Sequence, residues 1–263
     1  MLDRIVQTKK TEVATLLPRE AQLLRGLDDA PPPRDFRGAL DRPGEVRLIA
    51  EVKRRSPGAG PIRPDLVPSD LALSYEGAGA AAVSVLTDRD YFGGSLSDLR
   101  EVRAAVSLPV LRKDFILHPI QLVEARAAGA DGVLLIARIL SDAALMSLHS
   151  DALSLGLTPL VEVHGPSEME RALVAGTRLL GVNNRNLQTF STSLEVTLGL
   201  LPSIPRDVTV VSESGIRTPE EVETLGTAGV HGILVGETLL RARDPGAAAA
   251  ELAGRPRVAR SGD

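Results

Sequence analysis

Apolar residues along this chain gather in eight short runs that recur between about residues 47 and 236. The runs are nearly continuous and rich in Val, Ile and Leu, which is typical of parallel strands buried on both faces. The eight strands that this pattern predicts cover residues 47–52, 81–86, 109–113, 132–137, 159–163, 179–184, 208–214 and 232–236.

The segments between these runs carry the signals of amphipathic helices. Ser69-Asp70 and Ser141-Asp142 are caps, Thr218-Pro219 combines a cap with proline in the first turn, and glycine recurs just before the next strand. Eight alternating strand and helix units favour a closed parallel (β/α)8 barrel, the TIM-barrel fold, over an open sheet. No G-x-G-x-x-G follows the first strand, which weakens the dinucleotide-binding alternative.

The two ends of the chain fall outside the repeating units. Residues 1–46 are predicted to form an N-terminal helical extension, with a helix over about 2–24 and a proline-rich link at 31–33, that could cover one end of the barrel. The barrel itself is expected over residues 47–253, and residues 254–263 are expected to be a disordered tail. The length of 263 residues suits a single domain of this fold.

Composition excludes several classes of protein. The chain has no cysteine, which rules out disulfides and thiolate metal sites and suits a reducing cytosol. A net charge of -4 without a long basic run argues against a nucleic-acid partner. The first ten residues lack the apolar core of a signal peptide, and aliphatic runs of about five residues cannot span a membrane. We therefore expect a cytoplasmic protein.

Lysine is rare in this chain and its positions are informative. The sequence contains 26 Arg but only Lys9, Lys10, Lys53 and Lys113. Arginine does not release its proton at useful pH, whereas a buried lysine can. Two of the four lysines fall in the predicted N-terminal helix, and the other two fall at strand ends and need a chemical explanation.

Polar groups end six of the eight predicted strands, at the edge where barrels of this kind hold their active sites. They are Glu51 and Lys53 with Ser56 beyond, Lys113, Glu162, Asn183 and Arg185, Glu213, and Gly236-Glu237. Period-two spacing puts Glu51 and Lys53 on one face of their strand. One such group alone could equally be a structural ion pair. Asp114 is expected to face the helix layer, and His164 is interpreted as structural.

Glycine turns after the last two strands indicate a phosphate site. Ser214-Gly215 follows the seventh strand and Gly236-Glu237 follows the eighth. Glycine lets backbone N–H groups approach an anion, and barrels of this type usually bind phosphate at these two loops. Ordinary turn glycines are the alternative explanation.

The order and spacing of these motifs resemble the indole-3-glycerol phosphate synthase family from about residue 2 to residue 253. The motifs are IAEVKRRSP (49–57), DRDYFGGSLSDL (88–99), PVLRKDFILHPIQ (109–121), ADGVLLI (130–136), LVEVH (160–164), GVNNRNLQTF (181–190), VSESGI (211–216) and GILVGETLL (232–240). The resemblance implies conversion of 1-(2-carboxyphenylamino)-1-deoxyribulose 5-phosphate to indole-3-glycerol phosphate, with loss of CO2 and water, in tryptophan biosynthesis. It implies no cofactor and no metal.

The resemblance also implies roles for the strand-end groups. Lys113 would be the general acid of ring closure, and Lys53 would hold the anthranilate carboxylate and act again as an acid in the dehydration. Glu162 would be a base or stabilise positive charge at nitrogen, Glu51 would pair with Lys53, and Glu213 would bind a hydroxyl or tune a lysine. A lysine acid working near neutral pH calls for a pKa lowered by burial and a neighbouring cation.

The remaining implied site residues bind the substrate. Asn183, also counted with the catalytic groups, and Arg185 would orient it, and Ser56 would contact the carboxylate region. The list is completed by the aromatic pocket, Phe92, Phe115 and Leu234, and by the phosphate site, Ser214, Gly215, Gly236 and Glu237.

Two other interpretations stay open at this point. One is another phosphate-binding barrel of the same pathway, such as phosphoribosylanthranilate isomerase or a tryptophan synthase α-like chain, although neither needs two strand-end lysines with three carboxylates. The other is a non-catalytic barrel that binds a phosphorylated ligand. We expect a monomer with a small phosphorylated substrate and no nucleic-acid or membrane partner, which could associate with other enzymes of the pathway.

Overall fold

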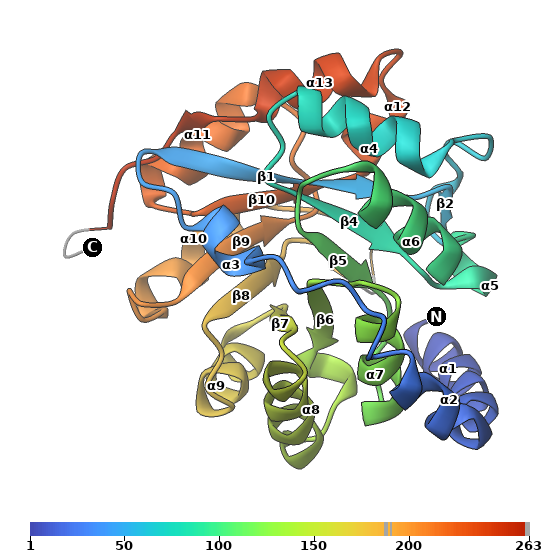
Figure 1. Ribbon diagram of the computed structural model, residues 1–263. Helices are drawn as coiled ribbons and strands as arrows, with labels where there is room; N and C mark the ends of the chain where they lie inside the picture. Colours follow the sequence, from blue (N-terminus) through green and yellow to red (C-terminus); the bar gives the residue numbers. More distant parts are fainter. Residues whose placement is uncertain (187–188, 190, 261–263) are drawn as a thin grey trace.

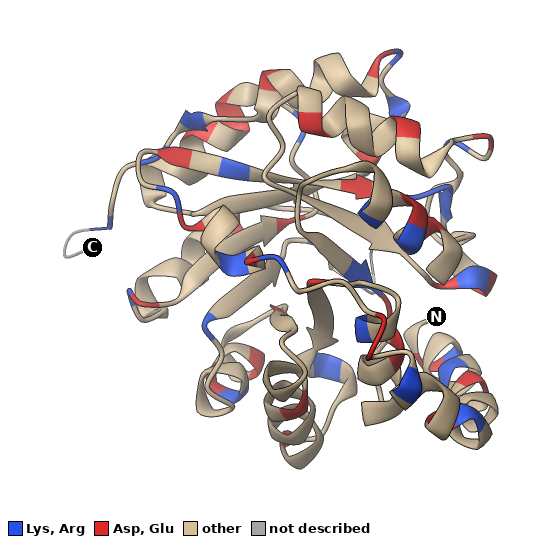
Figure 2. Ribbon diagram, viewed as in Figure 1, with Lys and Arg blue, Asp and Glu red and all other residues tan. Residues whose placement is uncertain are grey.

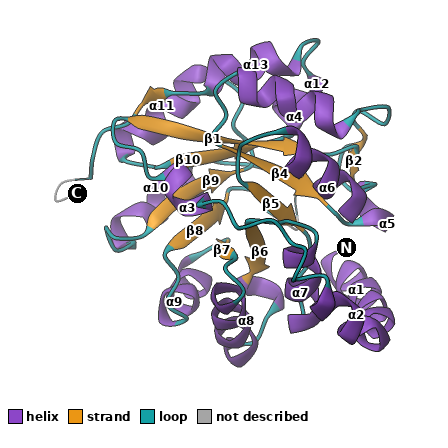
Figure 3. Cartoon of the chain, in the orientation of Figure 1, coloured by secondary structure: helices purple, strands orange, loops and turns teal. Residues whose placement is uncertain are grey.

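The computed structural model describes residues 1–186, 189 and 191–260. The predicted motif at 181–190 and the tail therefore lie partly outside the described residues, at 187, 188 and 190 and at 261–263. Eight parallel strands form a ring with helices outside it (Figures 1 and 3). The ring closes because β10 pairs with β1, so the predicted (β/α)8 barrel is confirmed. The strands are β1 (Glu45–Val52), β4 (Ala82–Leu86), β5 (Val110–Lys113), β6 (Gly132–Ile136), β7 (Thr158–Val163), β8 (Leu179–Asn183), β9 (Thr209–Glu213) and β10 (Gly232–Val235).

The helices between and after these strands form the outer layer, which buries the outward faces of the strands. The longer ones are α4 (Pro68–Gly77), α6 (Leu96–Ala105), α7 (Pro119–Ala127), α8 (Asp142–Ser154), α9 (Pro166–Val174), α10 (Glu195–Leu200), α11 (Pro219–Ala228) and α13 (Pro245–Leu252). Short elements in the loops are β2 (Arg55–Ser56), β3 (Gly60–Pro61), α5 (Arg89–Phe92), η2 (Ala137–Ile139), η3 (Leu201–Ser203) and α12 (Glu237–Arg241).

The N-terminal extension contacts both ends of the barrel. The predicted helix over 2–24 is divided into α1 (Leu2–Leu16), η1 (Leu17–Arg19) and α2 (Glu20–Arg25), because Pro18 lacks the N–H that would continue the helical ladder. A further helix, α3 (Phe36–Leu40), places Phe36 and Leu40 in one buried cluster with inward-facing strand residues such as Ile49. Since α1 reaches the other end of the barrel, the extension does more than cover one end.

The expectation of a disordered tail is wrong for the residues just after the barrel. Strand β11 (Arg255–Pro256) pairs antiparallel with Glu45 and Val46, which is why β1 begins earlier than predicted. The Arg260 guanidinium donates to four backbone carbonyls, including that of Ile204 at 3.1 Å. The tail is ordered here because its backbone and its arginines find acceptors on the barrel.

Charged residues of both signs are interspersed along the outer helices (Figure 2). None of the helices among the described residues is long and apolar enough to cross a membrane.

Candidate active site

A cavity of about 230 Å³ opens at the carboxyl ends of the barrel strands. Every site residue predicted from the sequence borders it, as do Met1 and, on α1, Leu2 and Ile5, which the sequence did not indicate. The predicted residues brought together are Glu51, Lys53, Ser56, Phe92, Lys113, Phe115, Glu162, Asn183, Arg185, Glu213, Ser214, Gly215, Leu234, Gly236 and Glu237.

Glu51 and Lys53 form an ion pair on one side of this cavity. The Lys53 Nζ lies 2.5 Å from Glu51 Oε1, as their period-two spacing predicted. Burial of Glu51 by itself disfavours its charged form, but Lys53 and Lys113 outweigh this and hold its pKa below the usual range. Glu51 is therefore a carboxylate at neutral pH and keeps Lys53 oriented toward the cavity.

Lys113 stands among three glutamates at the end of β5. Its Nζ lies 3.5 Å from Glu162 Oε2 and 3.9 Å from Glu213 Oε2. Burial alone would lower the pKa of Lys113, but the carboxylates of Glu162, Glu213 and Glu51 raise it above its usual value. The expectation of a lowered pKa is thus wrong for the free protein, because the nearest groups are anions. Lys113 is therefore protonated at neutral pH.

Glu213 is the carboxyl group of this cluster that keeps its proton. Burial, followed by the charge of Glu162, raises its pKa to about 8 despite the nearby Lys113. Its Oε1 is buried with no hydrogen-bond partner among the described residues and packs against Gly181, where a Cβ atom would lie 2.2 Å from it. Glu213 therefore adds little negative charge beside Lys113 at neutral pH.

Aromatic side chains form another wall of the cavity. The rings of Phe92, at the end of α5, and Phe115, just after β5, lie 6.0 Å apart at 38°. Leu234 on β10 is 5% exposed. Ser56 lies in the two-residue strand β2, where its Oγ accepts a hydrogen bond from the Ala59 backbone. This wall suits a flat apolar ring.

The loops after β8, β9 and β10 bring polar backbone to the cavity. Ser214 has a φ of 68° and Gly215 a φ of 82°, so two successive residues adopt the left-handed conformation that non-glycine residues rarely occupy. Gly236 is needed for a different reason, because a Cβ atom there would lie 2.3 Å from Glu51 Oε1. The Arg185 guanidinium lies 3.8 Å from the Glu237 carboxylate, and Asn183 Oδ1 accepts from the Arg185 backbone.

Two residues outside the predicted site support this constellation. His164, which the sequence analysis interpreted as structural, has its buried Nε2 3.5 Å from Glu162 Oε1, and its Nδ1 lies 3.2 Å from Glu168 Oε2. Asn184 binds Ser212 and the carbonyl of Ser214 through Nδ2 and so braces the loop after β9. Asn184 directly follows Asn183, so the alternation of side chains along a strand points it away from the cavity. That alternation could have predicted its supporting role.

Asp114 faces away from the active-site lysine beside it, as expected. Its Oδ1 pairs with Lys9 of α1 at 2.9 Å, and its Oδ2 pairs with Arg112 at 3.1 Å. The sequence placed Lys9 in a helix without a role, but the side chain is buried. Lys9 is therefore a third lysine of the chain that is held in place by a buried ion pair.

Comparisons with known protein families and with individual relatives find the same family along nearly the whole chain. The family model of indole-3-glycerol phosphate synthase matches residues 2–252. The indole-3-glycerol phosphate synthase of Burkholderia vietnamiensis is 49% identical over 96% of this chain and 98% of its own length. The one of Rhodopirellula baltica is 52% identical over 85% of this chain and 86% of its own length.

Solved structures with low sequence identity share the fold. Thiamine phosphate pyrophosphorylase from Pyrococcus furiosus superimposes with a TM-score of 0.60 at 19% identity, covering 79% of this chain and 93% of that one. The 3-hexulose-6-phosphate synthase of Salmonella typhimurium gives 0.62 at 15% identity, covering 79% and 96%.

Proposed function

The chain belongs to the indole-3-glycerol phosphate synthase family, carboxy-lyases of tryptophan biosynthesis, and on that premise we propose how its cavity divides the work of the reaction. Membership in this family argues against both alternatives from the sequence analysis, which were another barrel enzyme of the pathway and a non-catalytic barrel. The observation that carries the proposal is the protonated Lys113 held between Glu162 and Glu213.

Substrate binding uses three regions of the cavity. Lys53 and Ser56 hold the anthranilate carboxylate, since the Lys53 ammonium is kept in place by Glu51. The apolar wall of Phe92, Phe115 and Leu234 holds the ring. The polar residues opposite hold the ribulose chain and its phosphate; they are Asn183, Arg185, Ser214, Gly215, Gly236 and Glu237. Successive backbone N–H groups in left-handed residues suit an anion.

Ring closure requires a proton on the ketone oxygen. The ring carbon that bears the carboxylate attacks the ketone carbon, while Lys113 protonates the oxygen and converts it to a hydroxyl. Positive charge develops at the substrate nitrogen, where Glu162 stabilises it. That new cation competes for the same carboxylates, so the pKa of Lys113 falls at the moment when the proton leaves. Glu213, which keeps its own proton, donates a hydrogen bond without adding a second negative charge.

Loss of CO2, of water and of one proton then completes the indole. The carbon–carbon bond to the carboxylate breaks, its electron pair neutralises the cation, and CO2 leaves. Lys53 protonates the hydroxyl, which departs as water, and Glu51 receives the proton that the new double bond releases. Each step uses groups on the barrel strands or, for Lys53, on the residue directly after β1, where the barrel holds their positions.

The direct test is product formation by the purified protein. We expect 1-(2-carboxyphenylamino)-1-deoxyribulose 5-phosphate to give indole-3-glycerol phosphate, followed by the rise of indole fluorescence, without added metal. No fluorescence at high enzyme concentration would refute the proposed function. We further propose a cytoplasmic monomer that can associate with other enzymes of the pathway, because one chain completes the cavity.

A single variant tests the role of Lys113. Lys113→Arg keeps the positive charge between Glu162 and Glu213 but removes a group able to release its proton. We expect the variant to fold and to lose about 100- to 10,000-fold in kcat. Circular dichroism and steady-state kinetics check this, and a kcat within about threefold of the parent would contradict Lys113 as the acid.

A further inference from the structure

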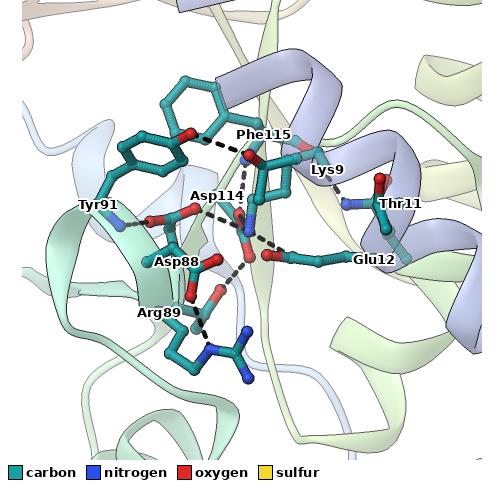
Figure 4. A network of polar contacts seen from close by, with 12 residues as sticks. Lys9, Thr11, Glu12, Asp88, Arg89, Tyr91, Asp114 and Phe115 are labelled. Carbon is teal, nitrogen blue, oxygen red and sulfur yellow. Dashed lines mark hydrogen bonds and ion pairs between the residues drawn. The ribbon is translucent and has the colours of Figure 1, made fainter. Parts of the chain in front are cut away.

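Lys9 on α1 is the centre of a buried ion network beside the cavity. Its side chain is 1% exposed, and its Nζ lies 2.8 Å from Glu12 Oε2, 2.9 Å from Asp88 Oδ2 and 2.9 Å from Asp114 Oδ1 (Figure 4). Burial alone would lower the pKa of Lys9, but the three carboxylates outweigh it and raise the pKa. A charge buried this deeply is stable only while its partners stay in place.

Asp88 connects this network to the first aromatic ring of the cavity. It is fully buried, and its Oδ1 accepts hydrogen bonds from the backbone N–H groups of Tyr91 at 2.7 Å and Phe92 at 3.1 Å. It is thus the N-cap of the four-residue helix α5, while its other oxygen faces Lys9. A helix this short depends on its cap, so the position of Phe92 depends on the orientation of Asp88.

Asp114 connects the same network to the second ring. Its Oδ1 accepts from the Phe115 backbone N–H at 2.8 Å as well as facing Lys9. Its Oδ2 accepts from Thr87 at 2.6 Å and pairs with Arg112. Asp114 therefore keeps a second cation when Lys9 is absent, whereas among the described residues Asp88 pairs with Lys9 alone.

Helix α1 itself is part of the cavity wall. Met1, Leu2 and Ile5 border the cavity, and Ile5 lies one helical turn from Lys9 on the same face. The Tyr91 hydroxyl adds a hydrogen bond to the Thr8 hydroxyl at 2.9 Å. Lys9 therefore connects three pieces of the wall, which are α1, α5 and the end of β5.

We propose that Lys9 is a positioning residue for substrate binding: its ammonium fixes Asp88 and Asp114, and through them holds Phe92, Phe115 and helix α1 against the substrate's aromatic ring. This inference rests on the proposed function, because it assigns the ring to that wall. Lys9 does not border the cavity, so the proposal involves no contact between Lys9 and the reacting atoms. The expected defect is therefore in substrate affinity more than in turnover.

The chain offers a matched pair of variants for the test. Lys9→Met removes the buried charge at nearly constant length, and Lys10→Met removes the exposed charge next to it on the same helix. At a temperature where both variants are folded, we expect Lys9→Met to raise KM about tenfold with kcat within about threefold of the parent. The Tyr91 and Phe92 amides should exchange their hydrogens faster. Lys10→Met should match the parent in both measurements.

Several outcomes would overturn the proposal. A parent-like KM in Lys9→Met shows that the network is only structural, and a fall in kcat at constant KM shows that it acts on the proton-transfer groups instead. If Lys9→Met does not fold, the double variant K9Q/D88N, which replaces the charged pair with a neutral one, must show the same rise in KM. A protein that forms no indole product defeats the proposed function, while hydrogen exchange still tests the network.

Discussion

The raised pKa of Glu213 makes a quantitative prediction about stability. Glu213→Gln mimics the protonated carboxyl group and removes the titration. In the parent, the pKa of Glu213 is about 8 in the folded chain, against an ordinary value of 4.5 when unfolded. A raised folded pKa means that the protonated form contributes stability fully below pH 4.5, and that this contribution is lost as pH rises through about 8.

The magnitude follows from this shift. One pKa unit is worth about 1.4 kcal/mol, so the complete shift corresponds to about 5 kcal/mol. Glu213 lies in one ion cluster with Lys113, so only part of this free energy should appear as a difference between the two proteins. We therefore expect Glu213→Gln to be about 1 to 3 kcal/mol more stable than the parent at pH 8.5, and less than about 1 kcal/mol more stable at pH 5.5.

Urea unfolding at pH 5.5, 7 and 8.5 provides the measurement. The quantity compared is the free energy of unfolding of each protein as a function of pH. Glu195→Gln is the control, because Glu195 is exposed on α10 and its replacement should leave the pH dependence of the parent unchanged. Parallel pH curves for the parent and Glu213→Gln would refute the reasoning, since they would mean that Glu213 is ionised in both states.

Two other predictions follow from contacts that the sequence did not indicate. His164→Phe removes the buried Nε2 beside Glu162, so kcat should fall about tenfold at nearly constant KM. Steady-state kinetics measure both, and an unchanged kcat would mean that the His164 ring only fills space. Truncation after Gly254 removes β11 and the Arg260 contacts, and should lower the free energy of unfolding by about 1 to 3 kcal/mol without changing kcat/KM. An equally stable truncated chain would contradict the second.

Local patterns were sufficient for the barrel and for the set of groups at its mouth. The eight apolar runs predicted eight parallel strands because strands buried on both faces are mostly apolar along their length. Strand ends in a closed barrel meet at one rim, so residues as distant as Glu51 and Glu213 could be assigned to one cavity. The rarity of lysine singled out Lys53 and Lys113, and both border the cavity.

The properties of the groups could not be predicted in the same way. A pKa depends on burial and on distances between charges from different strands, and the sequence gives no such distance for Lys113 and its glutamates. The expected lowering was wrong because the carboxylates of Glu162, Glu213 and Glu51 outweigh the effect of burial on the pKa of Lys113. The broken N-terminal helix follows from Pro18, a signal that was present in the sequence and was not used.

What the sequence determined by itself is the fold and the set of polar groups that border the cavity, because both depend on residue type and period. Only the tertiary structure decided which proton each group keeps and which distant segments complete the wall. Lys9 shows the difference most clearly: in the sequence it is one of two adjacent lysines on a helix, indistinguishable from Lys10. In the folded chain it is buried between Asp88 and Asp114, because the helix packs with that one face toward the barrel.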